Sequence, residues 1–142
     1  MIRRLRDTDI DTAIQIWLHA NLQAHCFIAD EYWVSNYDAV EKAMSEAEVY
    51  VFEDNATKKI EGFIGLTDNF IEGIFVRKES RSKGIGKKLI DYIKGIRTDL
   101  RLNVYIKNGR AVHFYQREHF TIQSANIDEN TNEKELTMIW SK

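Results

Sequence analysis

A short basic segment rich in glycine is the part of the chain best suited to chemistry. Residues 77–88 hold six Lys or Arg side chains against one Glu, a local charge of +5 in a chain of net charge −2. Gly84-Ile85-Gly86 opens a helical pattern of apolar residues at Ile85, Leu89, Ile90 and Ile93. Glycine lets a ligand approach the backbone, and a helix N-terminus offers free N–H donors and a positive dipole end. The segment therefore predicts a phosphate-binding loop.

Two common phosphate-binding patterns do not fit this loop. A Walker A loop needs a glycine where the chain has Arg81, and Ser or Thr where it has Lys88. The dinucleotide pattern needs a third glycine where Leu89 stands. The loop is therefore another class of phosphate site, or it has no ligand and is a solvated basic loop with a glycine turn.

Two blocks resemble the signature of the GNAT (GCN5-related) N-acetyltransferase superfamily. Arg81-Ser82-Lys83-Gly84-Ile85-Gly86-Lys87 is similar to its coenzyme A pyrophosphate loop, Arg/Gln-x-x-Gly-x-Gly/Ala. The segment from Asn108 to Phe120 is similar to its Asn-x-x-Ala-x-x-Phe/Leu-Tyr-x-x-x-Gly-Phe block, with His119 in place of the glycine. The small bacterial acetyltransferases of the YiaC/YjaB type share a further N-terminal pattern, which matches His25, Phe27, Ile28, Tyr32 and Trp33.

The resemblance implies that acetyl-CoA is the cosubstrate. The four histidines and one cysteine lack the spacing of metal ligands, so no metal is expected. Backbone N–H groups from Ser82 to Lys87 would hold the pyrophosphate of acetyl-CoA. Its pantetheine arm would pair with the backbone of three consecutive residues, Ile74, Phe75 and Val76. An N–H near Gly73 would polarise the thioester carbonyl. Further contacts would come from the second block, at Asn108, Ala111 and Phe114.

The resemblance also implies a general acid, whereas the base stays open. Tyr115 matches the family's acid. Full proton transfer from a phenol of pKa ~10 to a thiolate of conjugate pKa ~8.5 is uphill by roughly 2 kcal/mol, so a hydrogen bond to the departing thiolate is expected. Asn103 stands where some relatives carry a Glu that acts as the general base. Glu72 and His25 are the two candidates, and each is also explained as a merely structural polar residue.

The acceptor is a primary amine that the sequence does not identify: a protein lysine, a protein N-terminus or a small molecule. The aromatic residues expected to wall its site are Phe70, Trp33 and Phe27. Acidic residues at Asp30, Glu31 and 128–135 would suit a cationic amine. Cys26 is expected to be a small buried residue rather than a nucleophile.

The surrounding elements predict an α/β (α+β) fold, the single GNAT domain over residues 1–142. Its sheet is expected to be mixed, mostly antiparallel and flanked by helices, in the order β-α-α-β-β-β-α-β-α-β-β. One helix is expected after Asp7 or Thr8 and another after Asp30, with Trp33, Tyr37, Val40 and Met44 on one face. Residues 70–76 read as a buried central strand, in which Gly73 suggests a bulge or the close approach of another backbone.

The composition limits the other classes of protein. A single cysteine excludes an internal disulfide framework, and no segment resembles a leader or a membrane span, so a cytoplasmic protein is expected. Acetyl-CoA and an amine are the expected partners, without nucleic acid, membrane or metal, in a monomer or weak homodimer. A non-catalytic acyl-CoA-binding or sensor domain is the main alternative, and a nucleic-acid-binding protein that uses residues 77–88 is a third.

Overall fold

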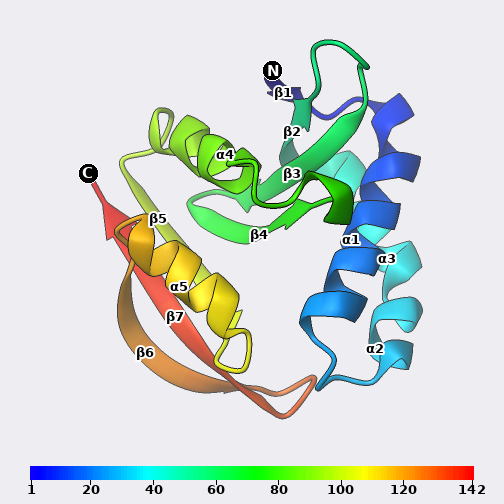
Figure 1. The fold of residues 1–142 in the computed structure, drawn as a ribbon. Coiled ribbons are helices and arrows are strands. Elements are labelled where there is room, and N and C mark those ends of the chain that lie inside the picture. The colour runs from blue at the N-terminus through cyan, green and yellow to red at the C-terminus, as the bar shows by residue number, and fades with distance from the viewer.

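The computed structural model describes residues 1–142, which form a mixed sheet with helices on both faces (Figure 1). The seven strands are β1 Ile2–Arg4, β2 Glu48–Glu53, β3 Ile60–Thr67, β4 Phe70–Val76, β5 Asp99–Tyr105, β6 Thr121–Asp128 and β7 Glu133–Ser141. The five α-helices are α1 Ile10–Ala24, α2 Asp30–Ser35, α3 Tyr37–Glu46, α4 Ile85–Lys94 and α5 Gly109–Arg117. No helix is both long and apolar enough to span a bilayer.

The sheet order is β1-β2-β3-β4-β5-β7-β6, and only the β4–β5 pair is parallel. The expected mixed, mostly antiparallel sheet is thus confirmed, and the order of elements differs from the expected one only by a third helix before β2. The parallel pair is brief: Phe70 lies opposite Arg101 and Ile71 opposite Leu102, and the pairing stops there. Since β4 and β5 both continue beyond that point, the two strands separate and leave facing backbone edges unpaired.

Two hydrophobic cores lie on opposite faces of the sheet. The first packs α4 and α5 against the sheet, with Leu89, Ile90 and Ile93 fully buried. The second packs α1 and the short helices α2 and α3 against β2 and β3, around Ile14 and Val51. Figure 1 shows α4 and α5 on one side of the molecule and α1 to α3 on the other. The separation of β4 from β5 opens between these two groups of helices.

Several details of the predicted elements are corrected by the structure. A short 3-10 turn, Asp7–Asp9, precedes α1, so neither Asp7 nor Thr8 caps that helix; the N-cap residue is Asp9, whose carboxylate accepts from Arg3 and from Arg6 N–H. The predicted helix after Asp30 is two helices that meet at Asn36. Cys26, expected to be buried, is exposed.

Strand β4 is central as predicted, but it is less buried than its apolar sequence suggests. Of its seven residues only Ile71 is buried. The reason is the open edge toward β5, which leaves Ile74, Phe75 and Val76 half exposed. The predicted bulge is present: Gly65 pairs with Gly73 whereas Leu66 pairs with Ile71, so Glu72 is the extra residue.

Candidate active site

A cleft of about 740 Å³ lies where β4 and β5 separate. Its floor is the open edge of β4, and its walls are the loop before α4, the helix α5 and the C-terminal end of α1. Arg77 N–H donates to the Glu61 carbonyl of β3. Because backbone groups alternate along a strand, those of Ile74 and Val76 point away from β3, toward the cleft. A ligand in the cleft can therefore pair with β4 as a strand would.

The loop before α4 presents a run of unpaired donors. No backbone N–H from Ser82 to Lys87 donates to a protein atom, and the first bond of the helix runs from Lys88 N–H to the Gly84 carbonyl. Ser82 and Gly84 adopt left-handed backbone conformations, with φ of 63° and 79°. Such a turn, followed by a helix N-terminus, is typical of an anion-binding site. α5 packs close to this turn, since a Cβ on Gly86 would lie 3.4 Å from the Phe114 ring.

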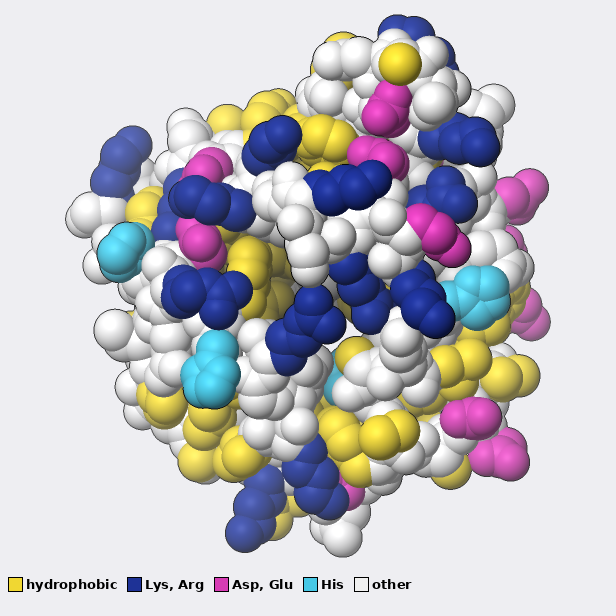
Figure 2. All heavy atoms as spheres, viewed as in Figure 1, with side chains coloured by type: hydrophobic (Ala, Val, Ile, Leu, Met, Phe, Trp, Pro, Cys, Tyr) yellow, Lys and Arg dark blue, Asp and Glu magenta, His cyan; other side chains and the backbone are white.

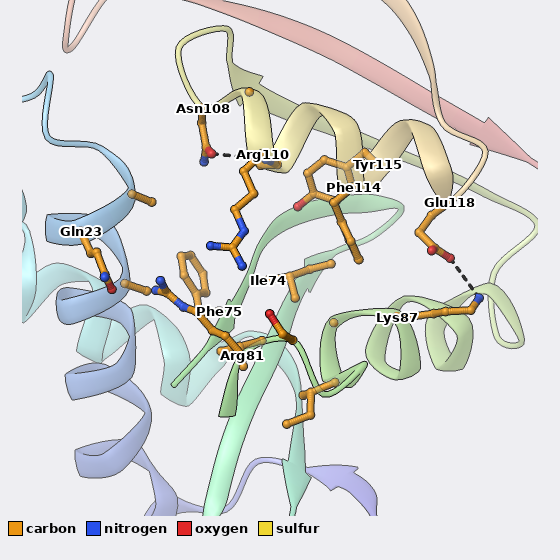
Figure 3. Close-up of a pocket in the computed structure, with 18 of the residues that line it drawn as sticks. Gln23, Ile74, Phe75, Arg81, Lys87, Asn108, Arg110, Phe114, Tyr115 and Glu118 are labelled. Carbon is orange, nitrogen blue, oxygen red and sulfur yellow. Dashed lines mark hydrogen bonds and ion pairs between the residues drawn. The ribbon is translucent and has the colours of Figure 1, made fainter. Parts of the chain in front are cut away.

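Tyr115 lies on α5 and faces the cleft, as Figure 3 shows together with Phe114 and Ile74. The side chain is only 8% exposed, and its hydroxyl makes no hydrogen bond to another protein group. Burial raises the pKa of the Tyr115 hydroxyl well above its ordinary value. The phenol therefore stays protonated and can donate to an anion that forms in the cleft.

The cleft is strongly basic. Arg81, Lys107, Arg110 and Arg117 line it together with Lys87, and Figure 2 shows Lys and Arg side chains gathered around the middle of this face. Lys87 is paired with the buried carboxylate of Glu118 at 3.2 Å, which ties α4 to α5. Arg81 and Arg110 form no ion pair within the protein. Two guanidinium groups are thus available to an anionic ligand.

His25 lies at the end of α1, where it lines the cleft opposite α5. Its Nδ1 is 3.0 Å from Asn21 Oδ1, and its Nε2 is 3.1 Å from Asn108 Nδ2. The ring stacks on Trp33, with centroids 5.4 Å apart, and meets Tyr105 edge-on at 5.1 Å. Burial among these groups lowers the pKa of His25 to about 4, so the imidazole is neutral at physiological pH.

Asn108 caps α5 as predicted, with its Oδ1 accepting from Ala111 N–H at 3.3 Å. The other amide position, Nδ2, faces His25. An amide has two donors and two acceptor lone pairs, so each end of Asn108 keeps one free hydrogen-bonding position. The residue can cap its helix and still bond a ligand in the cleft.

The remaining candidate residues lie outside the cleft lining. Lys83 is exposed on the loop, and Phe27 and Trp33 pack around His25. Phe70 lies under the Arg101 guanidinium, 5.1 Å from its ring centroid. Glu72 is exposed at the bulge. A Cβ added to Gly65 would lie 3.8 Å from the Cβ of Glu72 and 4.0 Å from Val49, which belongs to the core that packs against α1. Glu72 is therefore on the same face of the sheet as α1.

The cleft does gather most of the predicted cofactor residues. Those that line it are Ile74, Phe75, Val76, Arg81, Ser82, Gly84, Ile85, Gly86, Lys87, Asn108, Ala111 and Phe114, with Tyr115 and His25. Sequence reasoning missed Asn21, Arg110 and Glu118. The spacing of Asn21, one helical turn before His25, is the one signal that could have pointed to it.

Comparison with known proteins agrees with this geometry. The model of the acetyltransferase (GNAT) domain matches residues 45–122. The chain is 30% identical over 142 residues to the peptidyl-lysine N-acetyltransferase YiaC of Escherichia coli, covering 99% of this chain and 96% of the relative. It is 28% identical over 121 residues to the peptidyl-lysine N-acetyltransferase YjaB of Salmonella typhimurium, covering 85% and 83%.

Solved structures show the same fold. The apo form of Escherichia coli YjaB superposes with a TM-score of 0.88 at 24% identity, over 99% of this chain and 96% of that one. The PaiA N-acetyltransferase of Thermoplasma acidophilum, solved in complex with coenzyme A, gives 0.83 at 21% identity, over 100% and 98%. With the separated strands and the loop of free N–H groups, these matches identify the protein as an acetyltransferase of the GNAT family.

Proposed function

We propose that the protein transfers the acetyl group of acetyl-CoA directly to the ε-amine of a lysine in a peptide or protein. The observation that carries the proposal is the run of unpaired N–H groups from Ser82 to Lys87, beside the open edge of β4 and below Tyr115. The lysine acceptor is favoured because the relatives YiaC and YjaB are peptidyl-lysine N-acetyltransferases.

The cosubstrate would lie along the cleft from the loop to Tyr115. Its pyrophosphate would accept from the free loop N–H groups, with Arg81 adding charge. Its pantetheine amides would pair with the backbone of Ile74 and Val76, whose groups point into the cleft. Asn108 would use its two free hydrogen-bonding positions on the same arm. The thioester would then lie near the bulge at Gly73.

In the reaction the amine nitrogen attacks the thioester carbon, a C–N bond forms, and the C–S bond breaks. A backbone N–H near the Gly73 bulge would stabilise the oxyanion. The thiolate leaves with the bonding electron pair and takes up a proton from solvent, which balances the proton that the amine releases. Tyr115 would donate a hydrogen bond to the developing thiolate, and the raised pKa of its hydroxyl keeps the proton in place until charge appears on sulfur.

The amine must lose a proton before or during attack. A lysine of pKa ~10.4 costs roughly 4.6 kcal/mol to deprotonate at pH 7. We assign the base role to Glu72, acting directly or through a water, because it is exposed beside the bulge. His25 is the weaker candidate, since its Nε2 already accepts from Asn108 and would have to release that bond.

The test is acetyl transfer to a synthetic peptide with one lysine and a blocked N-terminus, followed by mass spectrometry. We expect an added acetyl group on the lysine at a rate that depends on enzyme concentration. The matched peptide with arginine in place of lysine should stay unmodified. If the same peptide with a free N-terminus were acetylated at that N-terminus alone, the acceptor would not be lysine. Acetyl-CoA binding without transfer to any amine would instead favour the non-catalytic alternative.

A further inference from the structure

An unbroken chain of hydrogen bonds crosses the cleft between α1 and α5. Asn21 Nδ2 donates to the Trp17 carbonyl at 2.9 Å, and Asn21 Oδ1 lies 3.0 Å from His25 Nδ1. His25 Nε2 lies 3.1 Å from Asn108 Nδ2, and Asn108 Oδ1 accepts from Ala111 N–H at 3.3 Å. No other hydrogen bond or ion pair joins residues 10–25 to residues 108–118. His25 is therefore the single polar link between these two walls.

The two ends of this chain fix the proton positions along it. Ala111 N–H can only donate, so Asn108 must present its oxygen there and its NH2 group to His25. The Trp17 carbonyl can only accept, so Asn21 must present its NH2 group there and its oxygen to His25. The imidazole is consequently a donor at Nδ1 and an acceptor at Nε2.

The aromatic neighbours hold the ring in that orientation. Trp33 stacks on one face of His25, and Phe27 and Tyr105 meet it edge-on with centroids 5.6 and 5.1 Å away. These three side chains come from α2, the turn after α1 and the end of β5. A ring packed in this way cannot turn to offer a different nitrogen to Asn108 without disturbing three elements.

We propose that His25 is a positioning residue, which acts on catalysis through Asn108. It fixes the amide of Asn108 so that the remaining N–H and lone pair face the cosubstrate arm, and it sets the distance between α1 and α5. The inference rests on the proposed function, because the value of a fixed Asn108 depends on acetyl-CoA lying in the cleft. It assigns His25 a role other than general base.

Substitution by glutamine separates positioning from proton transfer. A glutamine amide can accept from Asn108 and donate to Asn21, as the imidazole does, but it takes up no proton near pH 7. We expect His25→Ala to raise KM for acetyl-CoA about 3- to 10-fold, the range for losing one hydrogen bond. His25→Gln should recover most of that loss, and kcat/KM should keep its pH profile.

Asn108→Asp provides the complementary change. Aspartate keeps an oxygen for Ala111 N–H, so the cap of α5 is preserved. Its second oxygen cannot donate to Nε2, so the link to His25 is lost or reversed. If the two residues act through one bond, the double variant His25→Ala with Asn108→Asp should lose no more affinity than the worse single variant. Independent, multiplying losses would overturn the proposal.

The direct experiment is imidazole ¹⁵N NMR on the full chain, with binding of coenzyme A measured in parallel. We expect His25 to be protonated at Nδ1 and bare at Nε2 between pH 6 and 8, and Asn108→Asp to place a proton on Nε2. The exposed His113 serves as a control through His113→Gln, which should change neither the His25 signals nor KM.

A protonated Nε2 in the unmodified chain would overturn the proposal. A His25→Gln variant that binds coenzyme A normally, but loses as much turnover as a variant without the general base, would overturn it as well. If the unmodified chain does not bind coenzyme A, the proposed function fails instead, whatever the tautomer of His25.

Discussion

The two sides of the cleft are built by different means. On the α4 side, consecutive residues from Ser82 to Lys87 present backbone N–H groups in one turn. On the opposite side, His25 and Asn108 meet as side chains across 83 positions of sequence. The loop therefore depends on local conformation, whereas the α1–α5 contact depends on the whole fold. Substitutions should separate the two. Changes in charge or backbone conformation should affect binding at the loop, whereas changes in side-chain shape or histidine tautomer should affect the α1–α5 contact.

The largest effect is expected where the two sides meet, at Tyr115. Tyr115→Phe removes the hydroxyl that faces the cleft and leaves the ring in the core. Loss of a general acid typically lowers rates ~10²- to 10⁴-fold, so we expect kcat to fall within that range. Steady-state kinetics with the lysine peptide measures it, and calorimetry should find coenzyme A affinity within a few-fold of the unmodified protein. Unchanged turnover would remove Tyr115 from the mechanism.

The second effect concerns acid stability on the α1–α5 side. The folded protein lowers the pKa of His25 to about 4, below its ordinary value near 6.5. Between these values the unfolded chain binds a proton that the folded chain does not. The free energy of unfolding should therefore fall as pH decreases from 6.5 to 4, and this group should have no effect above 6.5.

Each unit of difference in pKa corresponds to ~1.4 kcal/mol of stability. Because His25 is partly exposed to solvent, we expect a smaller decrease in the free energy of unfolding, about 2 kcal/mol. Urea unfolding at a series of pH values measures it. His25→Gln should flatten the curve in that window, whereas His113→Gln should leave it unchanged. A slope that survives His25→Gln would show that another group is responsible.

The third effect tests the loop side. Arg81 has no ion-pair partner in the protein, so its charge is available to the pyrophosphate. We expect Arg81→Ala to weaken binding of coenzyme A about 10-fold and to make binding less sensitive to salt, since ionic contacts are screened. His25→Ala should weaken binding without changing its salt dependence. Lys42→Ala, an exposed charge on α3, is the matched control. Equal salt dependence in all variants would contradict the distinction between the two sides.

The smallest effect lies at the end of α5. His119 has a φ of 71°, in the left-handed region where a non-glycine residue costs ~1–2 kcal/mol. Glycine removes this strain but adds ~0.4–1 kcal/mol of chain entropy to the unfolded state. We expect His119→Gly to stabilise the fold by about 0.5 kcal/mol in thermal unfolding. His113→Gly, inside the same helix, should destabilise it by about 1 kcal/mol.

The sequence could predict what is local. The glycine turn, the cap at Asn108, the bulge at Gly73 and the place of Tyr115 on a short helix each follow from neighbouring residues. His119 in the glycine position of its block is another case: it occupies the left-handed C-terminal position that such a glycine would take. These features are predictable because the residues that indicate each of them are neighbours in the sequence.

The rest depended on contacts between distant segments. The exposure of β4 follows from the early end of its pairing with β5, which its apolar residues do not indicate. Cys26 is exposed because the turn after α1 points its neighbour Phe27, and not the thiol, toward Tyr105. The bond between His25 and Asn108 has no signal in either local pattern. A lone histidine after a helix fits a base, a ligand or a structural link equally well until its partners are known.

The most direct test of cosubstrate binding in the cleft is an amide NMR titration with coenzyme A. The chain has no proline, so every residue after the first carries a backbone N–H that can report. We expect the largest shifts at the amides of Ser82 to Lys87 and of Ile74 and Val76, with smaller changes at Asn108. Shifts confined to other parts of the surface, with these amides unmoved at saturation, would contradict binding between β4 and β5.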